Sequence, residues 1–417
     1  MSLPERTWAL LDRALEAYAN SPRATAWLRG HRARFAEPIR VAVAGPAGSG
    51  KSTLVRALAG DVEPAWQGQG VARFHVPQSR SQPELILVDT PAADGESAET
   101  GVVERACLDA DALLYLTAHP HAADLSLPRT VLDRPVARMS PITTLVVLSR
   151  ADELGGGRPD ALVSARQVAR RHRRVGELAA MCQDVVAVAG LAASGARTLS
   201  DEDFETVAAL AAVPKEELEP LLLSVDRFAA EPGRQAVLAR LGLFGVRLAT
   251  TLVRHGATSR TALSAQLLQR SGFTDLRDSI TRYLTEHAPV LKARSALLGL
   301  EVVLRMEPRP EAAALVTEFE RTLAAAHEFA ELRALSAVTT GRVRLPDELR
   351  EEAVRLLGGY GAEPASRLGV EIPDPQRAFG ALRRWQGCAA NPVLGAAERR
   401  AAAVVVRSCE ALVTGFR

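Results

Sequence analysis

This 417-residue chain has few aromatic residues, a small net charge and few lysines. The first two properties each exclude a class of function. Aromatic residues make up only 4% of the sequence, which argues against the platforms on which single-stranded nucleic acids stack. The formal net charge is only +2, too small for a protein that wraps DNA, so we expect no nucleic-acid partner. Only three of the 51 basic residues are lysines, a bias toward arginine that is typical of a high-GC genome.

Cysteine pairs and long apolar runs are also missing. The four cysteines lie far apart and form no C-x-x-C pair, so we expect neither a zinc site nor a disulfide framework. No stretch approaches about 18 uninterrupted apolar residues, and the first residues contain no apolar signal segment. These absences predict a cytoplasmic protein, with the inner face of the cell membrane as the place of any peripheral contact.

The chain divides into an α/β part and an all-α part. Residues 38–200 alternate short apolar runs with helical patterns, which is typical of a parallel sheet covered by helices on both faces. Residues 1–37 predict two helices that pack with a C-terminal helical bundle formed by residues 201–417. The expected strands lie at residues 39–44, 85–88, 112–116, 144–148 and 185–188, with a weaker strand at 71–76 near an edge.

Two helical segments admit more than one interpretation. Residues 241–253 are strongly apolar apart from Arg247, which favours a buried packing helix over a segment that inserts into a membrane. Arginines are concentrated between residues 166 and 174, where the helical pattern predicts a solvated face. Pro289 is expected to kink or split the long helix predicted over residues 273–305.

A phosphate-binding loop follows the first predicted strand. Residues 45–52 fit the pattern G-x-x-x-x-G-K-[ST] without a gap, between a predicted strand and a predicted helix. The glycines let backbone N–H groups turn inward around phosphates, Lys51 bridges the terminal phosphates, and the Ser52 hydroxyl binds Mg²⁺. The pattern predicts a nucleoside triphosphate without identifying its base. The nucleotide-binding residues expected here are Gly45, Pro46, Ala47, Gly48, Ser49, Gly50, Lys51, Ser52 and Thr53.

The ends of later strands complete the predicted site. Asp89 closes the strand at 85–88 and is placed to hold the water shell of Mg²⁺ opposite Ser52. Asp152 follows the strand at 144–148, where its carboxylate can accept two hydrogen bonds that guanine donates and adenine cannot. The sequence therefore predicts GTP and GDP as ligands, together with Mg²⁺. The residues expected around the base are Ser149, Arg150, Asp152, Ala189 and Gly190.

With these motifs the chain resembles the actinobacterial dynamin-like GTPases, most closely their isoniazid-induced mycobacterial members. The resemblance implies an α/β P-loop GTPase domain, with a mostly parallel sheet and helices on both faces, joined to an all-α helical bundle. It also implies self-association or pairing with a paralogous dynamin-like protein, peripheral contact with membrane lipids, and a role in membrane remodelling or division-site assembly. The similar segments are residues 149–155, 222–228, 241–247, 267–272 and 327–333.

The switch segments depart from the pattern of that family. No Thr lies between residues 54 and 89 to serve in the first switch, where Ser79 and Ser81 are the only hydroxyl side chains. The second-switch pattern D-x-x-G ends in Ala92. The position at which dynamins often have a catalytic Ser is a Gly here, which leaves its neighbour Ser49 as the candidate. We expect phosphate binding to survive these changes and the positioning of the attacking water to suffer.

Three functions therefore remain open from the sequence. The first is a slow GTPase whose heads dimerise and move the helical bundle when the nucleotide changes. The second is a hydrolysis-deficient scaffold that partners a competent dynamin-like paralogue, which the altered switches favour. The third is an ATP-using P-loop enzyme, but Asp152 and the lack of an L-S-G-G-Q signature argue against it.

Overall fold

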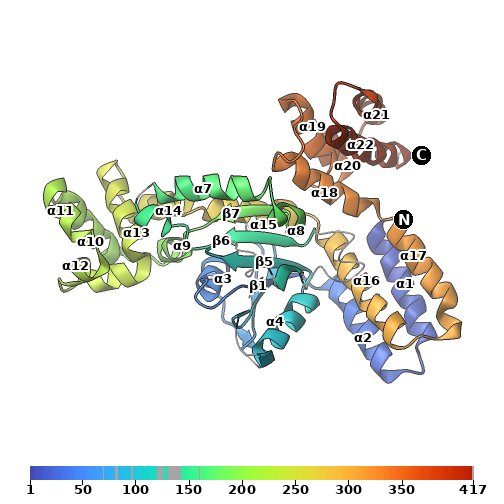
Figure 1. The fold of residues 1–417 in the computed structure, drawn as a ribbon, viewed down its shortest axis with the longest axis horizontal. Helices are drawn as coiled ribbons and strands as arrows, with labels where there is room; N and C mark the ends of the chain where they lie inside the picture. Colours follow the sequence, from blue (N-terminus) through green and yellow to red (C-terminus); the bar gives the residue numbers. More distant parts are fainter. Residues whose placement is uncertain are drawn as a thin grey trace.

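A seven-stranded β-sheet forms the centre of the computed structural model (Figure 1). The structure describes residues 1–68, 70–79, 83–94, 97–119, 125, 127–129, 142–158 and 160–415. The strands are β1 (Ile39–Ala44), β2 (Ala65–Trp66), β3 (Ala72–Val76), β4 (Leu85–Asp89), β5 (Ala112–Thr117), β6 (Thr144–Leu148) and β7 (Asp184–Ala187), in the order β2-β3-β4-β1-β5-β6-β7. The last five strands of that order are parallel, and β2 and β3 are antiparallel to their neighbours, so the expected mostly parallel sheet is confirmed.

The central strand β1 is buried on both faces, as the apolar run at residues 41–44 predicts. Val41 and Val43 belong to one hydrophobic core, whereas Ala42 and Ala44 belong to the other. Val43 pairs in parallel register with Asp89 of β4. This register brings the C-terminal ends of β1 and β4 together, at the edge where ligands bind in sheets of this type.

Helices cover both faces of the sheet. They are α3 (Lys51–Ala59), α4 (Ser97–Asp109), α7 (Ala161–His172), α8 (Glu177–Met181) and α9 (Gly190–Arg197), with a 3₁₀ turn at Leu154–Gly156. Helix α3 contributes to the core that contains Val41, whereas α4 and α7 contribute to the core that contains Ala42. The α/β domain is therefore a three-layer arrangement, with β1 and α3 meeting at its phosphate loop.

The remaining helices form three groups at the two ends of the sheet (Figure 1). One group packs on α9 and comprises α10 (Asp201–Ala212), α11 (Lys215–Leu221), α12 (Val225–Ala229), α13 (Arg234–Arg254) and α14 (Arg260–Arg270). The second joins the N-terminal helices α1 (Leu3–Ala17) and α2 (Pro22–Ala33) to α16 (Ala288–Met306) and α17 (Ala313–Ala324). The third comprises α18 (His327–Thr339), α19 (Asp347–Leu356), α20 (Pro364–Leu368), α21 (Pro375–Ala390) and α22 (Ala396–Thr414).

The segment between these groups runs beside the last strand of the sheet. Helix α15 (Phe273–Ile280) contacts β7 and continues through a π-helical turn at Thr281–Thr285. The helix stops there, and Pro289 lies in the first turn of α16, so the expected split of the long helix is confirmed. Short 3₁₀ turns at Arg34–Ala36 and Pro310–Ala312 precede β1 and α17.

The apolar helix α13 is used for packing. Leu241, Phe244 and Leu248 are buried, and the helix contacts α9, α10 and α14. Gly242 has a φ of 67°, which kinks the helix there. By length and composition alone α13 could cross a membrane, but half of its most apolar window is buried inside this structure.

Candidate nucleotide-binding site

The loop between β1 and α3 is shaped by its glycines. Gly48 and Gly50 have φ values of 68° and 87°, in the left-handed region that favours glycine. A Cβ on Gly45 would lie 2.3 Å from the carbonyl oxygen of Leu116, so a larger residue does not fit there. Gly50 is the N-cap of α3, which places the end of the loop at the positive end of that helix. The backbone is therefore curled as an anion cradle requires.

Lys51 lies in the first turn of α3 and is only 9% exposed. Its Nζ donates hydrogen bonds to the carbonyl oxygens of Gly45, at 3.0 Å, and Pro46, at 2.9 Å. Burial lowers the pKa of Lys51, while the carboxylates of Asp89 and Asp94 act to raise it. An ammonium group bonded only to neutral carbonyls is incompletely compensated, and a phosphate would supply the missing negative charge.

Asp89 and Ser52 meet where β4 ends and α3 begins. Burial raises the pKa of Asp89, and a hydrogen bond from the Ser52 side chain and the charge of Lys51 act to lower it. The second oxygen of this carboxylate, Oδ1, is buried without a hydrogen-bond partner among the described residues. A carboxylate beside a serine hydroxyl is a set of oxygen donors that suits Mg²⁺.

The chain after Asp89 folds back onto the phosphate loop. The backbone N–H of Ala93 donates to the carbonyl oxygen of Gly45, at 3.0 Å. The Oδ1 atom of Asp94 accepts a hydrogen bond from the backbone N–H of Ala47, at 2.6 Å. An exposed carboxylate thus uses one of the loop's own donors. The sequence patterns did not point to Asp94, because only the folded chain brings it against the loop.

A cleft of about 420 Å³ joins the phosphate loop to the ends of β6 and β7. Ten of the predicted residues line it: Gly48, Ser49, Gly50, Lys51, Ser52, Thr53, Ser149, Arg150, Asp152 and Gly190. Gly45, Pro46 and Ala47 form the rest of the loop beside the cleft, and Asp89 contacts Ser52. The predicted phosphate and base residues therefore come together around one space.

The end of the cleft away from the phosphate loop has its own geometry. Arg150 has a φ of 52°, and it is the only non-glycine residue of the described chain with a positive φ. Its guanidinium pairs with Glu153 at 3.2 Å. Burial raises the pKa of Asp152. Gly190 lines the cleft and Ala189 does not, and the Ala189 N–H donates to the carbonyl oxygen of Ser271 at 2.9 Å.

Three buried polar atoms in and beside this cleft lack a hydrogen-bond partner among the described residues. They are Ser49 Oγ in the phosphate loop, Asp89 Oδ1 beside Ser52, and Ser149 Oγ at the end of β6. Buried polar atoms without partners are costly, and a ligand in the cleft would supply partners for the two serines that line it, Ser49 and Ser149. The residues present therefore fit a nucleotide accompanied by a divalent cation.

The described residues offer less for positioning water than for binding phosphate. Ser49, the candidate catalytic serine, is only 4% exposed, although it lines the cleft. Ser81, from the expected first switch, lies outside the described residues. Ala92 takes the place of the second-switch glycine, and the next two residues are bonded to the phosphate loop. Ser49 thus remains a candidate, with no partner yet assigned to it.

The chain is similar in sequence to known proteins. A family model described as "50S ribosome-binding GTPase" matches residues 40–148, which contain the phosphate loop and Asp89. The isoniazid-induced protein IniC of Mycobacterium tuberculosis strain H37Rv is 32% identical over an alignment 489 positions long. That alignment covers 100% of this chain and 99% of IniC. IniC of strain CDC 1551 gives the same values.

Solved structures give a weaker likeness. The bacterial dynamin GTPase LeoA from ETEC is 13% identical, with 99% of this chain and 87% of LeoA covered and a TM-score of 0.29. The G domain of the T. maritima FeoB iron transporter is 20% identical, with 37% of this chain and 89% of the G domain covered and a TM-score of 0.26. At such scores the likeness supports no argument, so the assignment depends on the full-length identity to IniC. By that identity the chain belongs to the IniC family of dynamin-like GTPases.

Proposed function

We propose that this protein binds GTP and GDP with Mg²⁺ in the cleft at the phosphate loop and hydrolyses GTP slowly. The observation that supports this most is the pair of unpartnered buried atoms that line this cleft, Ser49 Oγ and Ser149 Oγ, together with the unpartnered Asp89 Oδ1 beside Ser52. The phosphates would be bound by the amides of residues 45–50 and by Lys51. A Mg²⁺ ion held by Ser52 and Asp89 would neutralise part of the phosphate charge.

Guanine is the base that the cleft favours. Burial raises the pKa of Asp152, so the ionised carboxylate needs partners, and the ring N–H and amino group of guanine would provide two. Adenine presents no such pair of donors. The Arg150 guanidinium lies 4.0 Å from the position of a Cβ on Gly48, so its side chain reaches from the base loop toward the phosphate loop. Its apolar stem is available to cover one face of the base.

Slow turnover is proposed because binding and water positioning are unequally supported. The shape of the phosphate loop, the buried Lys51 and the contact of Asp89 with Ser52 support phosphate binding. By contrast, Ala92 replaces the second-switch glycine, and Asp94 bonds to the loop at Ala47. Phosphoryl transfer depends mainly on positioning and charge stabilisation, so these changes are expected to reduce the rate more than the affinity.

Ala92 in the second switch and the bond of Asp94 to the phosphate loop also favour one alternative, a hydrolysis-deficient scaffold that pairs with a competent dynamin-like paralogue. Membership of the dynamin-like family supports either self-association or such pairing, with peripheral contact to membrane lipids. In both cases the biological role would be membrane remodelling or assembly at the division site. The two alternatives differ in whether GTP is consumed.

The test measures phosphate release from GTP and Mg²⁺ by the full-length protein, with and without liposomes. Slow release that the Lys51→Ala substitution abolishes supports the GTPase. Saturable GTP binding without release, under both conditions, supports the scaffold. Release by the purified protein that Lys51→Ala leaves unchanged would count against the proposed site.

A further inference from the structure

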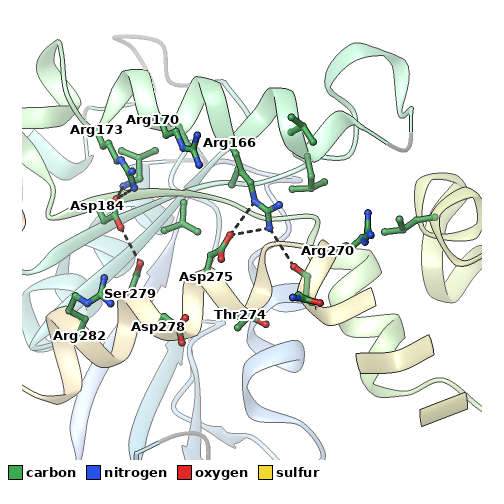
Figure 2. A pocket seen from close by; sticks show the side chains of 18 residues that line it. Arg166, Arg170, Arg173, Asp184, Arg270, Thr274, Asp275, Asp278, Ser279 and Arg282 are labelled. Carbon is green, nitrogen blue, oxygen red and sulfur yellow. Dashed lines mark hydrogen bonds and ion pairs between the residues drawn. The ribbon is translucent and has the colours of Figure 1, made fainter. Parts of the chain in front are cut away.

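A second and larger cleft, of about 730 Å³, lies on the side of the sheet formed by β7 (Figure 2). Helix α7 forms one wall, α15 and its π-helical turn form the other, and Val185, Val186 and Ala187 of β7 lie between them. None of the residues proposed to bind the nucleotide lines this space. Its volume falls within the range of small-molecule sites in proteins.

Arginine dominates the charged lining of this cleft. Arg166 and Arg170 extend from α7, Arg173 directly follows that helix, Arg270 ends α14, and Arg282 extends from the opposite wall. Three aspartates, at positions 184, 275 and 278, offset only part of that charge. The arginine-rich run was expected to be a solvated helix face. Arg170, Arg171 and Arg174 of this run are exposed, and Arg166, Arg170 and Arg173 also line the cleft.

The arginines differ in whether the protein neutralises them. Arg166 pairs with Asp275 at 3.1 Å, and Arg173 pairs with Asp184 at 3.3 Å. Arg170, Arg270 and Arg282 have neither a hydrogen bond nor an ion pair within the described part of the chain. Three guanidinium groups therefore face one space with their donors uncommitted, and planar guanidinium groups bind phosphate and carboxylate oxygens in pairs.

A buried network fixes the floor of the cleft. Asp184 accepts hydrogen bonds from the Val185 backbone N–H, at 2.8 Å, and from Ser279 Oγ, at 3.1 Å. The same carboxylate holds Arg173, whose Nε is buried and has no hydrogen-bond partner among the described residues (Figure 2). Arg173 is thus a pre-positioned donor, which reduces the entropy lost when a ligand binds.

The edge of β7 is closed to an added strand. The Val185 N–H is used by Asp184, and a Cβ on Gly272 would lie 2.1 Å from the carbonyl oxygen of Ala187, so the backbone at Gly272 covers that acceptor. An extended peptide therefore cannot pair along this edge. The apolar side chains of Leu162 and Leu248 also line the cleft. The space suits a small molecule with an anionic group and an apolar portion.

We propose that this cleft binds a phosphate-bearing small ligand, with its phosphate at Arg170, Arg173 and Arg282 and its apolar portion toward Leu162 and Leu248. A phosphate dianion can accept hydrogen bonds from several guanidinium groups at once, which a single carboxylate does less well. The ligand is either a soluble phosphate ester or the headgroup of an anionic phospholipid. Both present the same chemistry to the arginines.

The test uses the full-length protein with saturating GDP and Mg²⁺, so that the phosphate loop is already occupied. Inorganic pyrophosphate is titrated by calorimetry, and vesicles of phosphatidylglycerol and phosphatidylcholine are compared in a flotation assay with vesicles of phosphatidylcholine alone. The variants are Arg170→Gln and Arg282→Gln. The matched control is Arg171→Gln, which removes the same charge from the same helix at an exposed position that does not line the cleft.

We expect pyrophosphate to bind with an affinity that falls about tenfold in Arg170→Gln and Arg282→Gln and is unchanged in Arg171→Gln. Binding to the anionic vesicles alone, with the same dependence on the two arginines, would identify the lipid as the source of the phosphate. The proposal is overturned if neither probe binds, or if binding is equally affected by Arg171→Gln. Equal thermal unfolding of all three variants would show that the fold is retained.

Discussion

The contact between Asp94 and the phosphate loop predicts that the protein restrains its own nucleotide binding. The Asp94 carboxylate uses the Ala47 N–H, and its charge also acts on Lys51. An incoming phosphate must displace this carboxylate or lie beside its negative charge. We therefore expect Asp94→Ala to tighten nucleotide binding, more for GTP than for GDP, because the triphosphate has more charge.

The size of this effect follows from the geometry. A hydrogen bond to a charged group contributes about 1.5–3 kcal/mol when it is well formed and shielded. The Asp94 bond is short, at 2.6 Å, but exposed, so solvent screening reduces its contribution to about 0.5–1.5 kcal/mol. Since about 1.4 kcal/mol corresponds to a tenfold change, GTP should bind roughly 2- to 12-fold more tightly.

Fluorescent GTP and GDP, titrated into the wild type and Asp94→Ala, measure this difference directly. Asp61→Ala is the matched control, because Asp61 is an exposed acid just after α3 without an ion pair in the described residues. Weaker GTP binding by Asp94→Ala would refute the reasoning and would show that Asp94 assists the bound state. An equal gain in Asp61→Ala would assign the effect to net charge instead of to the contact.

Three further predictions concern the base and the helical packing. Asp152→Asn should lower the preference for GTP over ATP by about tenfold in a competition assay, since one charge-assisted acceptor is lost. An unchanged preference would show that the base does not bind at Asp152. Burial lowers the pKa of His31 to about 3 and that of His287 to about 4, so both stay neutral in the fold while the unfolded chain takes up protons below about pH 6.5. As the pH is lowered from 6 to 4, each of these two histidines should therefore reduce the free energy of unfolding by about 1.4 kcal/mol per pH unit. In urea titrations, His287→Gln should reduce the dependence of this free energy on pH. A slope that His287→Gln leaves unchanged would count against this burial. A Cβ on Gly299 would lie 2.3 Å from His31 Nε2, so Gly299→Ala should reduce the free energy of unfolding by about 1–3 kcal/mol in thermal unfolding. The control Gly30→Ala has open space at its Cβ and should not destabilise the protein. Equal stability of the two variants would contradict the packing of α2 on α16.

Local sequence signals defined some elements closely and others poorly. The start of α10 has a clear local signal, because Ser200 and Asp203 form a capping box there. Residues 215–229 look like one continuous helix in sequence but form two, because α11 ends at Leu221 and the Ser224 side chain caps α12. Strand β2 has only two exposed residues, too few to give a pattern.

The nucleotide cleft has a local signal in the sequence, whereas the arginine-lined cleft has none. Phosphate binding restricts a continuous stretch of chain, so residues 45–52 show the chemistry in their order. The second cleft needs α7 and α15, whose sequences lie about 100 residues apart, and only the fold brings Asp275 to Arg166. Asp94 likewise has no motif, because its partner is a backbone N–H. Predicting such contacts requires the tertiary structure.

Equilibrium binding of fluorescent GTP to the full-length protein and to Lys51→Ala tests the central claim most directly. Lys215→Ala, an exposed lysine on α11, is the matched control. We predict saturable binding of GTP that GDP displaces and that ATP displaces much less. Lys51→Ala alone should abolish it. Full affinity in Lys51→Ala, or equal displacement by ATP and GDP, would contradict a guanine nucleotide held at this loop.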